Sequence, residues 1–239
     1  MVKQKKLSIF SLKTSIIFIL TFFLIILYFY FSSYFEINNV SKAYITNQGD
    51  NTVSIIDLET LKTLKTLKVG VAPLGITILQ EKKLVFVGNV GTDDISVIDA
   101  VNDTLIKTIK LGTAPLSLAS NSEETKVYVT DWFQNNVLTI SADEMKVTRR
   151  LKVGVTPSGI AYNKKYKYQV ITNRDANTLE IYNEHDDLVK KIETGNHPFG
   201  VYSEGDFAYV ANVYDDSVSI INLVDWSKYE FMVGAHPYN

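Results

Sequence analysis

The chain has 239 residues, of which 46% are hydrophobic and 12% aromatic, enough for one large or two small domains with a packed core. Its formal net charge is −2, but four lysines, at positions 3, 5, 6 and 13, precede the first acidic residue, Glu36. Without them the remainder has 20 basic and 26 acidic residues, a net charge of −6, which disfavours a nucleic-acid partner because such binding depends on neutralising phosphates.

The first element in chain order is an apolar segment at residues 14–35 that carries no charge. As a helix it is long enough to cross a hydrocarbon core of about 30 Å. We therefore predict a basic cytoplasmic tail at 1–13, a transmembrane signal anchor at 14–35 and an extracytoplasmic domain at 36–239, since the lysine-bearing end stays in the cytoplasm. A cleaved signal peptide is the alternative, but Tyr30 and Phe31 are bulky for positions before a cleavage site.

The rest of the chain repeats one unit. Every proline lies in a Gly-x-x-Pro phrase, and the phrases follow one another at intervals of 42, 42, 41 and 39 residues: Pro73, Pro115, Pro157, Pro198 and Pro237. Each unit holds four short runs rich in β-branched and aromatic residues, which are typical of strands. Four strands in so short a unit must form an antiparallel meander, because parallel connections need a dozen or more residues each.

Repeats of this length with several short strands predict an all-β fold, a β-propeller of four-stranded antiparallel blades. The strand after each proline is expected to lie innermost and the lysine-bearing strand at the rim. Gly-x-x-Pro is then the link from one blade's rim strand to the next blade's inner strand, where proline fixes the turn.

The tetrapeptides Tyr-Ile-Thr-Asn at 44–47 and Tyr-Val-Thr-Asp at 128–131, each followed by a second strand and by Gly-x-x-Pro, resemble the YVTN family of β-propeller repeats. The resemblance covers about residues 42–239 in five copies. It implies an exported or cell-surface propeller, similar to surface-layer and periplasmic propellers and more distantly to lactonase-type, haem-d1 and nitrous-oxide-reductase propellers. The copies at 86–89, 170–173 and 209–212 depart from the motif, and Ser117 replaces a glycine.

Five repeats are visible, whereas the family's complete propellers usually have seven blades. An inner strand for the first blade would fall near residues 33–37, and the phrase at 234–239 stands where a sixth inner strand would begin. We therefore expect an open or truncated array more than a closed five-bladed ring. An open array exposes sheet edges, which favours self-association or a partner.

The loops between the second and third strands should share a face with the Gly-x-x-Pro turns. They are rich in carboxylates and hold one basic residue, Arg174, so this face is expected to be acidic. Asn and Asp recur at two fixed places in these loops, as expected for side chains that bond the loop backbone. Binding of a divalent cation or a cationic ligand by Asp94, Asp131, Asp175 and Asp216 is the functional alternative.

Two histidines and two aromatic residues complete the candidate ligand-binding set. His197 and His236 stand before the last two prolines, near the expected channel mouth, where they are either fillers of repeated turns or acid–base or metal groups. Trp132 and Phe133, side by side in one loop, are either an exposed contact or packing over a neighbouring blade. No dedicated metal site, no cofactor and no catalytic residue can be assigned.

These observations favour a membrane-tethered binding or scaffolding module at the cell surface, with a protein, glycan or cationic ligand. A propeller enzyme of lactonase-like or redox type, using the central channel, is the alternative. Fold alone cannot decide between them, because one fold can carry sites with different functions.

Overall fold

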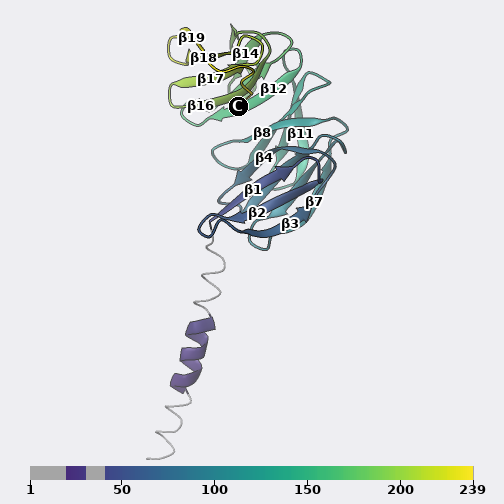
Figure 1. Cartoon of the computed structure of the whole chain (residues 1–239), viewed down its shortest axis with the longest axis vertical. Coiled ribbons are helices and arrows are strands. Elements are labelled where there is room, and N and C mark those ends of the chain that lie inside the picture. The colour runs from purple at the N-terminus through teal and green to yellow at the C-terminus, as the bar shows by residue number, and fades with distance from the viewer. Residues whose placement is uncertain (1–19, 31–40, 239) are drawn as a thin grey trace, which may run out of the picture. The chain divides into compact units, whose positions relative to one another are not determined.

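The computed structural model describes residues 20–30 and 41–238 (Figure 1). By its internal contacts the chain divides into two compact units, Met1–Ala43 with Asp57–Lys62, and Tyr44–Ile56 with Thr63–Asn239. Residues 20–30 are helical. Within the two described ranges no helix combines the length and hydropathy that a membrane crossing needs. The predicted basic tail, the rest of the predicted anchor and the predicted strand at 33–37 lie outside these ranges.

In the described part of the chain, nineteen strands form five antiparallel sheets, which we number as blades one to five in chain order. Blade one has three described strands, β1 (Lys42–Asn47), β2 (Thr52–Asp57) and β3 (Thr63–Lys68). Blade two comprises β4 (Pro73–Leu79), β5 (Leu84–Asn89), β6 (Asp94–Asp99) and β7 (Thr104–Lys110). Blade three comprises β8 (Pro115–Ser120), β9 (Lys126–Asp131), β10 (Asn136–Ser141) and β11 (Lys146–Lys152). Blade four comprises β12 (Pro157–Asn163), β13 (Tyr168–Asn173), β14 (Thr178–Tyr182) and β15 (Leu188–Glu193). Blade five comprises β16 (Pro198–Glu204), β17 (Phe207–Asn212), β18 (Ser217–Asn222) and β19 (Lys228–Met232).

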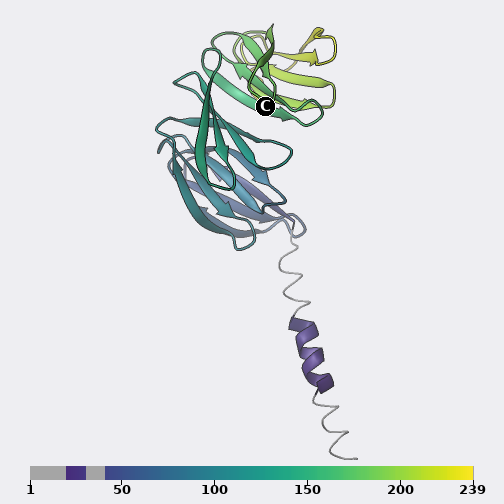
Figure 2. The same cartoon turned by 180° about the vertical axis from the view of Figure 1, so that it is seen from behind.

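Each sheet is a meander whose strands pair in chain order, as the sequence predicts. The first strands of successive four-stranded blades, β4, β8, β12 and β16, contact one another in series (Figure 1). Figure 2 shows the same sheets from behind. Sheets that stack face to face with their first strands adjacent have the architecture of a β-propeller. The prediction of an all-β fold with four-stranded blades is confirmed for blades two to five.

The core lies between the blades. Phe86 and Val97 on blade two are fully buried against Val127, Val129 and other aliphatic residues of blade three. Equivalent clusters join blades one and two, three and four, and four and five. Burying such a side chain contributes about 1.5–3 kcal/mol, so each blade is stabilised mainly by its neighbours.

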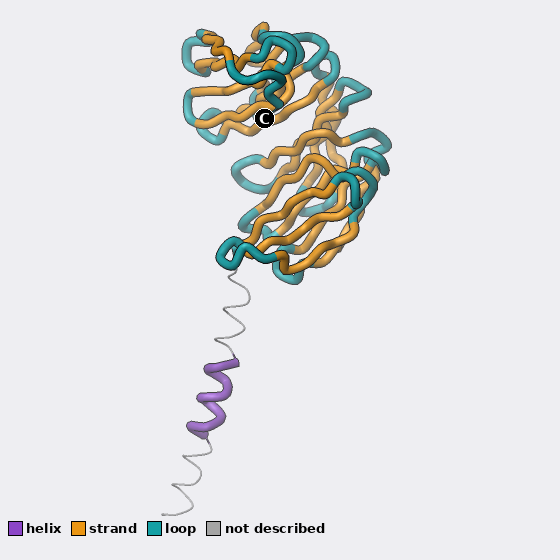
Figure 3. The backbone as a smooth tube through the Cα atoms, viewed as in Figure 1, coloured by secondary structure: helices purple, strands orange, loops and turns teal. Residues whose placement is uncertain are grey.

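Loops and turns join the strands of each sheet (Figure 3). The Gly-x-x-Pro turns lie beside the loops between second and third strands, to which backbone hydrogen bonds join them. Pro157, for example, is paired with Asn173 at the end of β13. In four of the five turns the residue before proline has a positive φ between 52° and 56°: Ala72, Thr156, His197 and His236. This left-handed conformation is unusual for residues with a side chain.

A side-chain hydrogen bond holds each of these four turns. The N–H of the residue before proline donates to the loop residue of the preceding blade, at 2.8–2.9 Å: Asn51, Asn135, Asn177 and Asp216 are the acceptors. We call this bond the turn hook. Among the described residues, the turn before Pro115 forms no such bond, and there Gly112 has the positive φ, 70°. Four members of the second recurring Asn and Asp series therefore bond the backbone of the next blade's turn, whereas the expectation was a bond to the backbone of their own loop.

Candidate functional site

The candidate site lies on the face formed by the Gly-x-x-Pro turns and the loops between second and third strands. Two of its predicted carboxylates are buried within that face. Asp94 accepts hydrogen bonds from the side chains of Asn89, at 2.8 Å, and Lys110, at 2.6 Å. Asp131 accepts one from the hydroxyl of Thr113 and two from backbone N–H groups of its own loop. Through these contacts both side chains stabilise the loop structure.

Asp216 and Asp175 lie nearer the surface. Asp216 is the acceptor of the turn hook to His236. Asp175 accepts from Arg174, at 2.8 Å, and from the hydroxyl of Thr156, at 2.7 Å, and its carboxylate lies 3.8 Å from Nε2 of His197. Among the described residues, Asp175 therefore lies beside the ring of a predicted histidine, whereas Asp216 contacts the backbone of the other one.

A neighbouring carboxylate, Asp215, is held ionised by its own turn. The backbone N–H of Asn196 donates to it at 2.6 Å and the side-chain amide at 2.7 Å. These two bonds, the backbone bond first, hold the pKa of Asp215 below its usual range. Asp215 thus contributes a negative charge to the loop face at neutral pH.

Arg174 makes cation–π contacts with two aromatic rings. Its guanidinium carbon lies 5.5 Å from the ring centroid of Trp132 and 6.0 Å from that of Tyr214. Tyr214 in turn lies 4.2 Å, centroid to centroid, from His197 and 6.2 Å from His236. Cation–π contacts of this kind fix both the ring and the guanidinium. The two predicted histidines and Trp132 are therefore joined into one cluster by Arg174 and Tyr214.

Beside this cluster is an apolar hollow of about 160 Å³, lined by Val90, Ala114, Leu116, Trp132, Phe133 and Phe199. Trp132 packs against Phe199 of blade five, with centroids 6.1 Å apart, whereas 74% of Phe133 is exposed. The sequence left two roles open for this aromatic pair, packing and an exposed contact, and each residue has one of them. Trp132 packs against Arg174 of blade four and Phe199 of blade five, and Phe133 projects into solvent at the edge of the hollow.

The arrangement suits a planar or apolar group that enters the hollow beside a fixed guanidinium. Of the described residues, no three or more His, Cys, Asp or Glu side chains lie close enough to hold a metal ion. Sequence reasoning missed Arg174, Tyr214 and Phe199 as members of the site. The signal for Arg174 was present, because it is the single basic residue in the five loops.

A family model described as YNCE-like beta-propeller matches residues 32–208. No curated protein matches the sequence. Among solved structures, a catalytically inactive virginiamycin B lyase from Staphylococcus aureus with quinupristin is similar, at a TM-score of 0.73 and 15% identity, covering 85% of this chain and 71% of that chain. A functionally unknown protein from Desulfotomaculum acetoxidans has a TM-score of 0.73 and 15% identity, covering 82% and 68%. At such identities these similarities show the fold alone.

Proposed function

Because the chain belongs to the YNCE-like beta-propeller family, we propose that it is a binding module whose ligand docks on the loop face, at the hollow beside Trp132 and Phe133. The observation that carries this proposal is an exposed aromatic ring, Phe133, at the edge of a purely apolar hollow, next to a guanidinium in contact with two rings. Rings of this kind supply most of the binding energy in many interfaces. The ligand is a protein or glycan that offers an apolar or planar group.

We further propose that the propeller carries YVTN-type repeats and is held outside the cytoplasm by the apolar segment at 14–35. The support is the uncharged stretch behind a lysine-rich tail in the sequence. Protease added to intact cells or spheroplasts should then digest the propeller while the protein stays in the membrane fraction. Protection of the propeller, or its release as a soluble fragment, would contradict this location.

A propeller enzyme of lactonase-like or redox type is the second candidate. One observation favours it, the approach of His197 to Asp175, since a carboxylate can orient an imidazole for acid–base catalysis. Nδ1 of His197 is buried and has no hydrogen-bond partner among the described residues. Lactone hydrolysis by the purified protein, lost in His197→Gln, would favour the enzyme.

Binding can be tested through the fluorescence of Trp132. The chain has two tryptophans, and Trp226→Phe leaves Trp132 as the sole emitter. Titration with cell-envelope glycans and envelope proteins should shift its emission, and Phe133→Ala should weaken that response. If no such ligand perturbs Trp132, or if Phe133→Ala binds as tightly as the parent, the site is misassigned.

A further inference from the structure

The loop face has a second cavity, of about 450 Å³, where blade four meets the turn into blade five. Sites for small ligands have volumes of about 300–1,000 Å³. The cavity shares no lining residue with the hollow beside Trp132, and its lining is polar. Two carboxylates, two amides and two hydroxyl groups line it: Glu193, Asp215, Asn177, Asn196, Thr178 and Thr194. None of the described residues that line it is basic.

The polar lining departs from the repeat. By the strand register, Glu193 occupies the position that is lysine in blades one to three: Lys68, Lys110 and Lys152. In the turn, Thr194 and Asn196 replace mainly aliphatic residues, which are Val69, Leu111 and Val153 at the first position and Val71, Thr113 and Val155 at the second. A cavity formed by the repeat alone would therefore be cationic and largely aliphatic, so this lining is specific to blade four.

In two other blades the aligned lysine folds over this part of the loop. Nζ of Lys110 donates to the carboxylate of Asp94 at 2.6 Å, and Nζ of Lys152 donates to the backbone carbonyl oxygen of Gln134 at 3.1 Å. The blade-four counterparts of those two acceptor residues, Thr178 and Ala176, both line the cavity. The cavity is thus the place that a lysine side chain covers in blades two and three, and Glu193 leaves it open.

One carboxylate of the cavity is fixed and the other is free. Asn196 donates to Asp215 through its backbone N–H and its side-chain amide, and a Cβ on Gly195 would lie 2.8 Å from Oδ2 of Asp215, so the turn and the loop are packed closely. A carboxylate has about four acceptor sites, which leaves some of those on Asp215 for a ligand. Glu193 is exposed, and among the described residues no hydrogen bond or ion pair holds it. Both carboxylates can therefore accept hydrogen bonds from a bound group.

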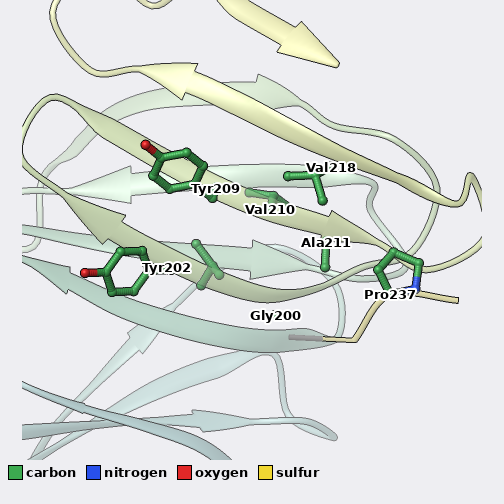
Figure 4. A pocket seen from close by; sticks show the side chains of 8 residues that line it. Gly200, Tyr202, Tyr209, Val210, Ala211, Val218 and Pro237 are labelled. Atoms are coloured by element: carbon green, nitrogen blue, oxygen red, sulfur yellow. The ribbon is translucent and has the colours of Figure 1, made fainter. Parts of the chain in front are cut away.

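The apolar hollow on blade five is of a different kind (Figure 4). It is lined by residues of β16, β17 and β18 together with Pro237, and the N–H of Gly200 donates to the carbonyl oxygen of Tyr238 at 2.9 Å. The next Gly-x-x-Pro turn thus lies against that hollow, which makes it part of the path of the repeat. The cavity at Glu193 instead arises where blade four departs from the repeat.

We propose that this cavity binds a primary ammonium group at the end of an unbranched carbon chain, as in a lysine side chain or a diamine. An ammonium group has three N–H donors and no acceptor, which suits a lining of carboxylate, amide and hydroxyl oxygens. It would donate to Glu193 and Asp215, and hydrogen bonds between charged groups are stronger than neutral ones. The carbon chain would lie where the repeat's own lysine lies in blades two and three.

Titration calorimetry of the purified full chain in detergent tests this site. The probes are cadaverine, a diamine, and the acetylated peptide Gly-Lys-Gly amide, whose only ammonium group is that of its lysine. Pentanediol, which has the carbon chain of cadaverine and no charge, is the control ligand and should not bind. The amine that binds more tightly identifies the source of the ammonium group.

A charge reversal at Glu193 supplies the matched variants. Glu193→Lys restores the residue of blades one to three and should lower the affinity for both amines about tenfold or more, because repulsion replaces attraction and the new side chain covers the cavity. Glu81→Lys makes the same change of charge on the exposed hairpin between β4 and β5, and should bind both amines as the parent does.

Each outcome decides the proposal. Binding of either amine that is lost in Glu193→Lys, kept in Glu81→Lys and absent with pentanediol supports the site. No binding of either amine, equal binding of pentanediol, insensitivity to Glu193→Lys, or an equal loss in both lysine variants overturns it. The hollow beside Trp132 shares no lining residue with this cavity, so none of these results depends on the ligand of that hollow.

Discussion

The turn hook can be dissected at Asn135, where two contributions are separable. Its side chain accepts the N–H of Thr156 at 2.8 Å, and its own φ is 56°. Asn135→Gly removes the acceptor but tolerates the left-handed conformation, so it should cost about 1–3 kcal/mol, the penalty of an unsatisfied, largely buried N–H. Asn135→Ala also introduces strain of about 1–2 kcal/mol, for a sum of about 2–5 kcal/mol.

Thermal unfolding followed by circular dichroism measures these costs. At about 2–4 °C per kcal/mol for a chain of this size, Asn135→Gly should lower Tm by about 2–12 °C and Asn135→Ala by several degrees more. Asn135→Asp is the matched control, because Asp216 fills the same place in blade five, and its effect should stay within about 0.5 kcal/mol. A glycine variant as stable as wild type would refute the hook as a stabilising bond, and equal Tm values for glycine and alanine would refute the strain.

Three further predictions follow from burial and backbone geometry. Burial, first of all, raises the pKa of Tyr128 above the value of about 10 for an unfolded tyrosine, so the contribution of this protonated tyrosine to stability is complete below that pH and is lost as pH rises further. Tyr128→Phe should therefore delay alkaline unfolding, which phenolate absorbance and circular dichroism can follow. Gly159→Ala would drive a methyl group into the carbonyl oxygen of Phe199 and should destabilise by about 1–3 kcal/mol in urea unfolding, whereas Gly49→Ala, with open space around it, should not show a clash. Phe133→Ala, at an exposed ring, should leave the free energy of unfolding within about 0.5 kcal/mol of wild type while it weakens ligand binding. A large loss of stability would contradict the surface role.

The repeat made the fold predictable. Five prolines at intervals of 39 to 42 residues set the period, and four β-rich runs in each period allowed only a meander, as blades two to five show. The position of the cationic strands at the rim followed from the same logic, because charges protect open edges. Lys107 at the rim and Phe86 in the core are representative of this agreement.

The turn conformation and the site cluster could not be read in the same way. A positive φ before proline, as at Thr156, depends on an acceptor 21 residues earlier, and no local propensity reports such a partner. The cluster of Trp132, Arg174 and Phe199 joins three blades, so it depends on how the sheets are stacked. Within one period each of these residues looks like ordinary variation in a loop or strand.

That cluster has a mechanical consequence. The first-strand contacts run from each of blades two to five to the next, so the stability of one blade depends on its neighbours. Trp132, Arg174 and Phe199 come from three consecutive blades, and a molecule bound against them would clamp all three at once. Ligand binding would thereby stabilise all three blades against local unfolding, with no hinge or moving loop required.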